Sequence, residues 1–436
     1  AETLLGLRQD LDTWSGTLWG RTELNEFEAS TDWLPRADWY GFSQPLFDGL
    51  AYWTSHSSAG YADLEPGYLP KTAGDPFSAA GLPYVADASG MVAMTRHEVD
   101  APFMIGPVNV NPFVMGEAAY WEEGLNGSQE IDRYVISGGV QAHLGATKVM
   151  PFIRSSLWNL NGLAHKSDVF VEYRVTDVSR GLTDIAQYNE IDDNAQERFR
   201  GRYVTQIFPG LIPPEFDPRF YAVRFGAGMW TTAPWHELVT DQQVVRFRWR
   251  NRLQTKIGPP DAPRTRDWMI WEYGAGFYPN ADRDNFGEDF GMIYGNYRWN
   301  ISDRTSILSD GMIDLFQNSQ ELWSIGVLTQ RSLRGSLYLG LRQVKAANFL
   351  DSQTAIASYS YLMSPKWIST ASFAYDIAAS ESRGSSLTFS RVGLDWLFHF
   401  GFGIDTSKDN VGFAFALEPR FGPPSPTNLS YLLGLQ

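Results

Sequence analysis

The chain has 436 residues, a formal net charge of -15 and a pI near 4.9. This acidity argues against nucleic acid as a partner, because phosphate binding needs a basic surface. The sequence contains no cysteine, which excludes disulfides and thiolate chemistry. It also contains no run of 18 or more apolar residues that would form a transmembrane helix, so a membrane role would have to use strands.

The first residues, "AETLLGL", lack an initiator methionine and the basic start, apolar stretch and cleavage site of a signal peptide. We therefore expect a processed or trimmed chain.

Prolines fall in or near several early segments that otherwise have the pattern of strands. Each proline removes one hydrogen-bond donor from the ladder, so a seam between such strands would open more easily. The alternative is that these prolines begin strands or lie in turns. The residues concerned are Pro35, Pro45, Pro102, Pro107 and Pro112.

From residue 168 onward, segments with a strict period of two follow one another. Neighbouring side chains of a strand point to opposite faces, so this period gives each face its own chemistry. In the first segment, valines and a tyrosine share one face while Glu172 and Arg174 share the other. The predicted strands are Asp168–Thr176, Arg219–Trp230, Val244–Leu253, Glu321–Gln330, Gly335–Gln343, Ser390–Phe402 and Asn410–Glu418.

The third of these segments, "VVRFRWRNRL", carries arginine at every second position: Arg246, Arg248, Arg250 and Arg252. Alternate residues of a strand lie roughly 6.7 Å apart, so this basic ladder would be about 20 Å long and could contact phosphates or acidic sugars. The other interpretation is a lattice of ion pairs with carboxylates on neighbouring strands, for which Glu272 is a candidate partner.

Many of these segments reach about ten residues, the length that a tilted strand needs to cross a bilayer. Backbone groups in the hydrocarbon core of a membrane must all be paired, so a sheet there can have no open edge. The pattern therefore predicts an all-β fold: a large antiparallel transmembrane β-barrel of roughly 18–26 strands, forming one domain over residues 1–436. The arginines would face the lumen. A soluble array of β-sandwiches or a propeller is the competing interpretation.

Turns and interfacial aromatic residues complete this prediction. Polar segments rich in Gly, Asn and Asp are expected to be turns, at 280–289, 380–386 and 405–410. Tryptophans at segment ends would form the two interfacial girdles. These tryptophans are Trp19, Trp121, Trp230, Trp299 and Trp367.

The sequence predicts no catalytic or metal site. The six histidines have no HxH or HxxxH neighbours, and no G-x-S-x-G elbow or P-loop is present. The loop at 280–289 is acidic, but Phe286 occupies the place where a calcium loop needs a ligand. We therefore expect no enzyme activity, no cofactor and no bound metal.

Several stretches in order resemble the barrel of the LptD family of lipopolysaccharide-assembly outer-membrane proteins, also called organic solvent tolerance proteins. The stretches are "LPRADWYGFSQPL" (34–46), "TRHEVDAPFMIGPVNVNPFVMGEAAYW" (95–121), "LAHKSDVFVEYRVTDV" (163–178), "YNEIDDNAQERFRGR" (188–202) and "VRFRWRNRLQTKIG" (245–258). The family's periplasmic jelly-roll and its cysteines have no counterpart here.

The resemblance implies an integral protein of a Gram-negative-type outer membrane that inserts lipopolysaccharide into the outer leaflet. It implies a lateral gate between the first and last strands, which matches Pro35 and Pro45, with the segment 410–422 as their partner strand. Its partners would be lipopolysaccharide, an LptE-like lipoprotein plug, an LptA-like periplasmic bridge and membrane lipids. The alternative function is a general or anion-preferring porin, which needs no gate.

Overall fold

The computed structural model describes residues 3–22, 30–65, 88–125, 129–189, 191, 217–259, 261–315, 320–346, 350–405 and 410–419. The described residues form twenty strands with a few short helices. They group into two compact units, and strands β8 to β12 have residues in both.

The first seven strands belong to unit 1 (residues 1–144, 170–247 and 276–291). Each strand pairs antiparallel with the next, except that β5 pairs with β7, while β6 forms a short hairpin on β7. The strands are β1 (Thr3–Asp10), β2 (Trp14–Thr22), β3 (Ser30–Leu46), β4 (Ala51–Glu65), β5 (Ala88–Asp100), β6 (Phe103–Ile105) and β7 (Val108–Trp121).

Five long or central strands follow. β8, which pairs with β7, is 25 residues long. The strands are β8 (Ile131–Ser155), β9 (Leu160–Val178), β10 (Gln242–Ile257), β11 (Arg264–Phe277) and β12 (Phe290–Asn300).

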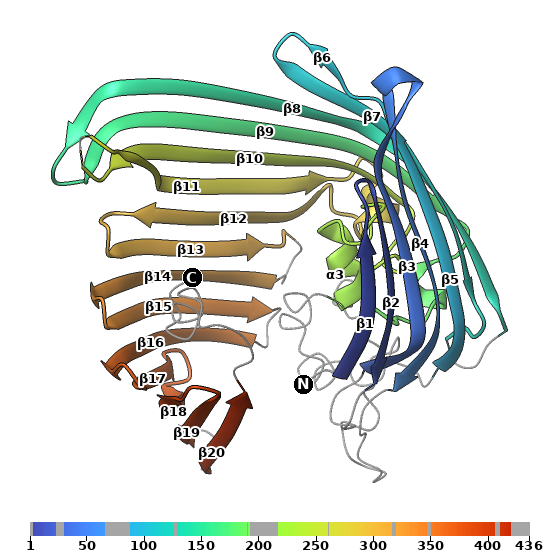
Figure 1. Ribbon diagram of the computed structural model, residues 1–436. Coiled ribbons are helices and arrows are strands. Elements are labelled where there is room, and N and C mark those ends of the chain that lie inside the picture. Colours follow the sequence, from blue (N-terminus) through green and yellow to red (C-terminus); the bar gives the residue numbers. More distant parts are fainter. Residues whose placement is uncertain are drawn as a thin grey trace. The chain divides into compact units, whose positions relative to one another are not determined.

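Unit 2 (residues 145–169, 248–275 and 292–436) contains the remaining strands, shown from yellow to red in Figure 1. From β12 to β20 each strand pairs antiparallel with the next. The strands are β13 (Thr305–Ile313), β14 (Gln320–Ser332), β15 (Gly335–Ala346), β16 (Leu350–Ser364), β17 (Trp367–Asp376), β18 (Glu381–Val392), β19 (Trp396–Asp405) and β20 (Asn410–Pro419).

Apolar side chains are exposed at alternate positions along these strands. On β8, Tyr134 and Ile136 are exposed while Arg133 and Val135 are buried, and on β15 Leu339 and Leu341 are exposed. An aqueous surface would not carry such rows, whereas the lipid-facing side of a membrane sheet requires them. The predicted fold class and the predicted location, an integral protein of an outer membrane, are therefore confirmed. No described helix is long and apolar enough to cross a membrane.

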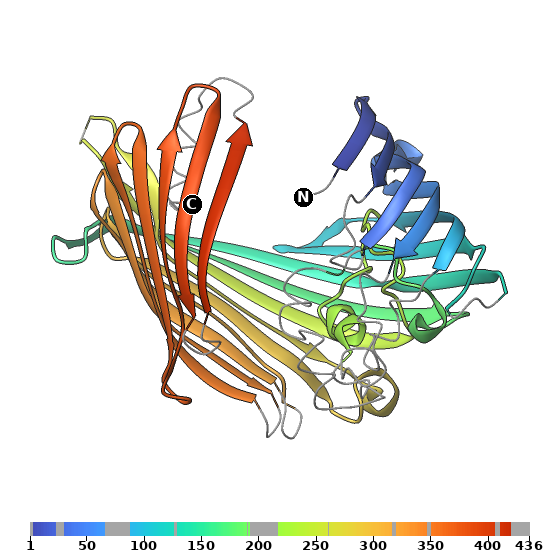
Figure 2. The same ribbon diagram turned by 90° about the horizontal axis from the view of Figure 1, so that it is seen from below.

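The segment that joins β9 to β10 packs on one face of the strands of unit 1, which we call the inner face. Its described residues are 179–189, 191 and 217–241, and we call them the β9–β10 segment. It contains the 3-10 helix η2 (Leu182–Asp184) and the helix α3 (Pro218–Arg224). Figure 2 shows the green helix beside the blue and cyan strands.

The helix α3 corrects the predicted strand Arg219–Trp230. Asp217 caps the helix by accepting a hydrogen bond from the Arg219 backbone N–H at 2.9 Å, and Pro218 occupies the first turn, where no N–H is needed. Gly226 and Gly228 follow with φ of 91° and 72°, in the turns that come after the helix. The apparent alternation therefore came from a helix followed by turns.

Two other boundaries differ from the prediction. The expected strand Ser390–Phe402 is two strands, because β18 ends at Val392 and a tight turn follows, in which the Gly393 N–H donates to the Trp396 carbonyl. The expected turn at 380–386 is mostly the start of β18. Short polar residues allow either structure, so local composition did not decide it.

Three of the five predicted girdle tryptophans lie elsewhere. Trp19 donates to Asp38 on the inner face, Trp121 is completely buried, and Trp230 belongs to the β9–β10 segment. Trp299 and Trp367 lie at or next to strand ends, as expected; Trp121 is the last residue of β7, but it is buried inside the protein. Packing with the β9–β10 segment explains the first two exceptions, because Trp121 stacks on His236 and Trp19 packs against the core cluster that contains Ile185, Ala186 and Tyr188.

Candidate functional site

The inner face of unit 1 carries a series of buried charged side chains from successive strands. They alternate with the exposed apolar residues described above, so the period of two assigns them to the opposite face. They are Arg36 and Asp38 on β3, His56 on β4, Arg96 on β5, Glu117 on β7, Arg133 on β8, and Glu172 and Arg174 on β9.

Glu117 lies between two arginines at the centre of this series. Its carboxylate accepts hydrogen bonds from Arg96 Nε and, at 3.0 Å, from Arg133 Nε. All three side chains are fully buried. A buried carboxylate with two guanidiniums leaves one positive charge in excess, which must be compensated by other acceptors.

The backbone of the β9–β10 segment supplies these acceptors. Arg96 donates to the carbonyls of Gly228 (2.7 Å), Trp230 (3.1 Å) and His236 (3.1 Å). Arg133 donates to His236 (2.8 Å) and Glu237 (3.3 Å). The two arginines therefore attach the segment to the strands through at least five hydrogen bonds.

Further arginines extend the attachment along the inner face. Arg174 donates to the Met229 carbonyl at 3.2 Å and pairs with Glu172. Arg246 pairs with the same glutamate at 3.4 Å, and Arg36 donates to the Asn189 side chain at 2.8 Å. We call Arg36, Arg96, Arg133, Arg174 and Arg246 the arginine clamp.

Apolar packing holds another part of the β9–β10 segment. Ile185, Ala186 and Tyr188 are buried against residues of β3, β5 and β7, including Trp33 and Met94. The segment thus combines a hydrophobic core with charged anchors, as a folded domain does, and it is positioned independently of the lipid.

His236 and Glu237 lie at the buried contact between the segment and the clamp. The imidazole stacks on Trp121 with ring centroids 5.7 Å apart, and neither of its nitrogens has a hydrogen-bond partner in the described part of the chain. Burial, with Arg133 and Arg96 nearby, lowers the pKa of His236 well below its usual value. Burial raises the pKa of Glu237, although its carboxylate accepts a hydrogen bond from Asn189. His236 is therefore neutral.

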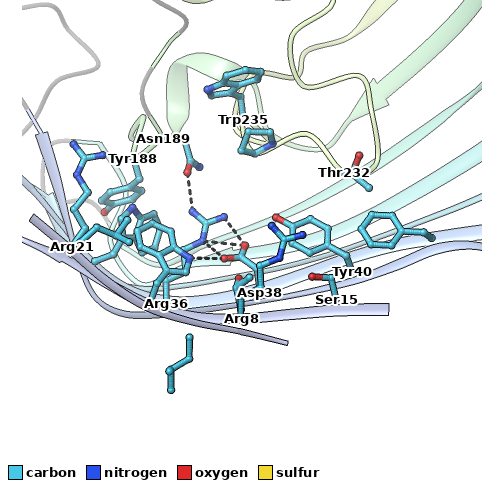
Figure 3. Close-up of a pocket in the computed structure, with 18 residues that line it drawn as sticks. Arg8, Ser15, Arg21, Arg36, Asp38, Tyr40, Tyr188, Asn189, Thr232 and Trp235 are labelled. Carbon is cyan, nitrogen blue, oxygen red and sulfur yellow. Dashed lines mark hydrogen bonds and ion pairs between the residues drawn. The ribbon is translucent and has the colours of Figure 1, made fainter. Parts of the chain in front are cut away.

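A cavity of about 810 Å³ separates the β9–β10 segment from strands β1 to β3. Figure 3 shows Trp235 and Thr232 of the segment on the opposite side of this cavity from Arg36, Asp38 and Arg8. The charged residues that line it are Arg8, Arg21, Arg36 and Asp38.

Asp38, the one carboxylate among these residues, is already engaged. It accepts hydrogen bonds from Arg36 Nη2 (2.9 Å) and Trp19 Nε1 (2.9 Å), and His56 Nε2 lies 3.1 Å away. Arg36 also lies over the ring of Trp33, 4.5 Å from its centroid. The charged floor of the cavity is therefore an internally paired and rigid group.

Pro35 and Pro45, the predicted gate residues, both lie in β3. This strand pairs with β2 on one edge and with β4 on the other, so both of its edges are occupied. The last strand, β20, pairs with β19. Of the segment expected to pair with the prolines, residues 420–422 lie outside the described residues.

The four arginines of the predicted ladder lie on β10, and three of them face carboxylates. Arg246 pairs with Glu172, Arg250 with Glu272 at 3.7 Å, and Arg252 with Asp267 at 3.0 Å. The partner named from the sequence for this row, Glu272, is thus close to Arg250. Arg248 and Arg250 are exposed.

Sequence reasoning missed the clamp arginines other than Arg246 and the whole β9–β10 segment. One signal was present: Glu172 and Arg174 lie on the same strand face, opposite a clean apolar row. Charged residues on the inner faces of several strands indicate a polar structure filling the interior. On the segment, Arg96, Arg133 and Arg174 bind backbone carbonyls, which no sequence pattern identifies.

Comparisons with known proteins give structural similarities only. No protein-family model matches the chain, and no curated protein sequence does either. The siderophore receptor PirA of Acinetobacter baumannii is 6% identical over 96% of this chain and 70% of its own, with a TM-score of 0.39. A ferric enterobactin receptor variant of Pseudomonas aeruginosa, in complex with enterobactin, is 6% identical over 95% and 69%, with a TM-score of 0.40.

A variant of the Rh. blastica porin is 7% identical over 76% of this chain and 90% of its own, with a TM-score of 0.29. The chain spans 70% of PirA and 58% of the chain that it matches in the FpvAI–pyocin S2 complex. None of these similarities carries a substrate over to this chain.

The LptD interpretation is wrong. The solved structures that match are siderophore receptors and porins, and no sequence match supports the family. Lipopolysaccharide insertion, the LptE-like plug and the LptA-like bridge are corrected with it. The stretches 34–46, 95–121, 163–178 and 245–258 resembled that family because any strand with lipid on one face and a polar interior on the other alternates in the same way. Of the stretch 188–202, only residues 188, 189 and 191 are among the described residues.

Proposed function

We propose that this protein is a porin-like channel of an outer membrane that prefers small anions. The observation that carries this proposal is the cavity between the β9–β10 segment and strands β1 to β3. Three arginines and one aspartate line it, in a chain whose formal net charge is -15. Positive charge is therefore concentrated where the segment approaches the strands.

A segment attached to the inner face of a membrane sheet narrows the space beside that face. Here the arginine clamp and the apolar core hold the segment in one position, so the space that remains beside the strands has a fixed size and lining. A passage of this kind selects solutes by size and by charge.

Simple electrostatics gives the size of the expected preference. A monovalent ion about 8 Å from one arginine in water gains roughly 0.5 kcal/mol, which is about a twofold effect on its local concentration. Arg8 is the most accessible of the cavity arginines, because 67% of its side chain is exposed although it pairs with Asp10. Reversing its charge should change the preference by roughly 1 kcal/mol, or about fivefold.

The exposed residues of the ladder on β10 supply a second proposed contribution. Arg250 is about half exposed and lies 3.7 Å from Glu272, an arrangement in which screening leaves the guanidinium accessible to solution anions. This contribution is proposed to be smaller than that of Arg8, because Glu272 offsets much of the charge.

Planar-bilayer recording tests the proposal. The purified chain is reconstituted, and the reversal potential is measured in a KCl gradient. We expect steady currents that favour chloride, with the preference lowered about fivefold in Arg8→Glu. Arg383→Glu is the matched control, because Arg383, on β18, pairs with Asp376 at the end of β17 and is 44% exposed. No current, or a cation preference in the unmodified chain, would refute the proposal.

A further inference from the structure

The cavity of unit 1 has a second property besides its charge, which is a high density of aromatic rings. Six rings line it, on both the strand side and the segment side. They belong to Trp19, Trp33, Tyr40, Phe42, Tyr188 and Trp235. An aromatic lining of this kind is not required for the passage of inorganic ions alone.

The rings form two groups on either side of the Arg36–Asp38 pair. Trp33 lies 6.1 Å from Trp19 and 6.2 Å from Tyr188, both in tilted arrangements. Tyr40 and Phe42 are parallel, with centroids 5.9 Å apart. Trp235 faces these strand side chains from the other side of the cavity (Figure 3).

The polar groups of the cavity favour an anion over a neutral sugar. A sugar needs acceptors for its hydroxyl groups, but Asp38 is engaged by Arg36, Trp19 and His56. Ser15 donates its hydroxyl proton to Asp10 at 2.6 Å, so this proton is not available to a sugar oxygen. A guanidinium has five N–H donors, and toward the described residues Arg8 uses only its Nε–H, which donates to Asp10.

We propose that this cavity binds small aromatic carboxylates as they pass, an inference that rests on the proposed channel function. The carboxylate lies at Arg8, and the flat ring packs between Trp235 and the aromatic residues of β3. Planar rings gain from offset or edge contacts with such walls, and the cavity volume falls within the range of sites for drug-sized molecules.

Saturable block of the chloride current by 2-naphthoate tests the inference. Cyclohexanecarboxylate carries the same charge without a flat ring, and glucuronate carries it on a sugar. We expect 2-naphthoate to block the current at concentrations about three- to tenfold lower than cyclohexanecarboxylate, and glucuronate to be the weakest of the three.

Variants separate the ring contact from the charge contact. Trp235→Leu should weaken block by 2-naphthoate about three- to tenfold while changing block by cyclohexanecarboxylate much less, and Trp235→Phe should retain most of the effect. Phe42→Leu, on the strand side, provides the same test if the Trp235 variants do not fold. Trp367→Leu, which removes a ring at the start of β17, is the control outside the cavity.

The two proposals fail in different ways. A chloride-selective current on which 2-naphthoate and cyclohexanecarboxylate act equally overturns the aromatic-carboxylate inference and leaves the channel intact. Stronger block by glucuronate than by 2-naphthoate also overturns it. Quenching of tryptophan fluorescence by 2-naphthoate, lost in Trp235→Leu, would support the binding site even if no current is found, and the channel function alone would then be wrong.

Discussion

Replacing Glu117 by glutamine tests whether the arginine clamp holds the β9–β10 segment in place. The change keeps the size of the side chain and removes its charge. Arg96 and Arg133, both fully buried, would then face each other without the carboxylate that they share. Removing one partner of a buried ion pair costs about 3–5 kcal/mol, because the remaining charge is not compensated.

The cost should appear as local release of the segment rather than as unfolding of the strands. The strands are held by backbone ladders that do not depend on the Glu117 side chain, whereas Arg96 and Arg133 bind the carbonyls of Gly228, Trp230, His236 and Glu237. Both guanidiniums reach water at the lowest cost in free energy if the segment opens away from the inner face.

Limited proteolysis in detergent, together with bilayer conductance, measures this release. We expect faster cleavage within residues 217–241 and a larger, less selective conductance in Glu117→Gln. Glu321→Gln is the matched control, because Glu321 pairs with Lys345 at 3.8 Å in a half-exposed site, where the loss is at most about 1 kcal/mol. Wild-type cleavage rates and conductance in a folded Glu117→Gln protein would refute the clamp.

Three further predictions concern the same segment and the ladder on β10. Burial lowers the pKa of His236 well below its usual 6.5, so docking of the β9–β10 segment is complete above about pH 6.5 and is lost as the pH falls below that value. Proteolytic cleavage of the segment should therefore accelerate on acidification, and His236→Phe should remove this part of the pH dependence. Gly228 has φ +72°, and an added Cβ would lie 2.4 Å from the Leu238 carbonyl oxygen. Gly228→Ala should therefore strain the segment by roughly 1–3 kcal/mol and increase conductance. Gly116 has open space around it, so Gly116→Ala should not change conductance. Arg250→Ala should shift the reversal potential modestly toward potassium and leave proteolysis unchanged, since an exposed pair contributes about 1 kcal/mol or less; faster cleavage in this variant would contradict the assignment.

Where a predicted strand is present in the structure, the sequence by itself determined which of its side chains share a face. Val175 and Tyr173 are exposed while Glu172 and Arg174 are buried, as the period of two predicts, because adjacent side chains of any strand point to opposite sides. The same local rule made Glu272 a correct partner for Arg250, because those residues lie on neighbouring strands.

Only the tertiary structure decided what the inner face contacts. Arg219–Trp230 alternates like a strand but forms a helix and turns, and Trp121 is buried under His236 instead of lying at an interface. Two of the clamp arginines, Arg96 and Arg133, bind backbone carbonyls more than a hundred residues away, such as Gly228 for Arg96. Every residue carries such a carbonyl, so the pattern of side chains does not show which carbonyls the arginines bind. The cavity likewise exists only where the docked segment stops short of β1 to β3.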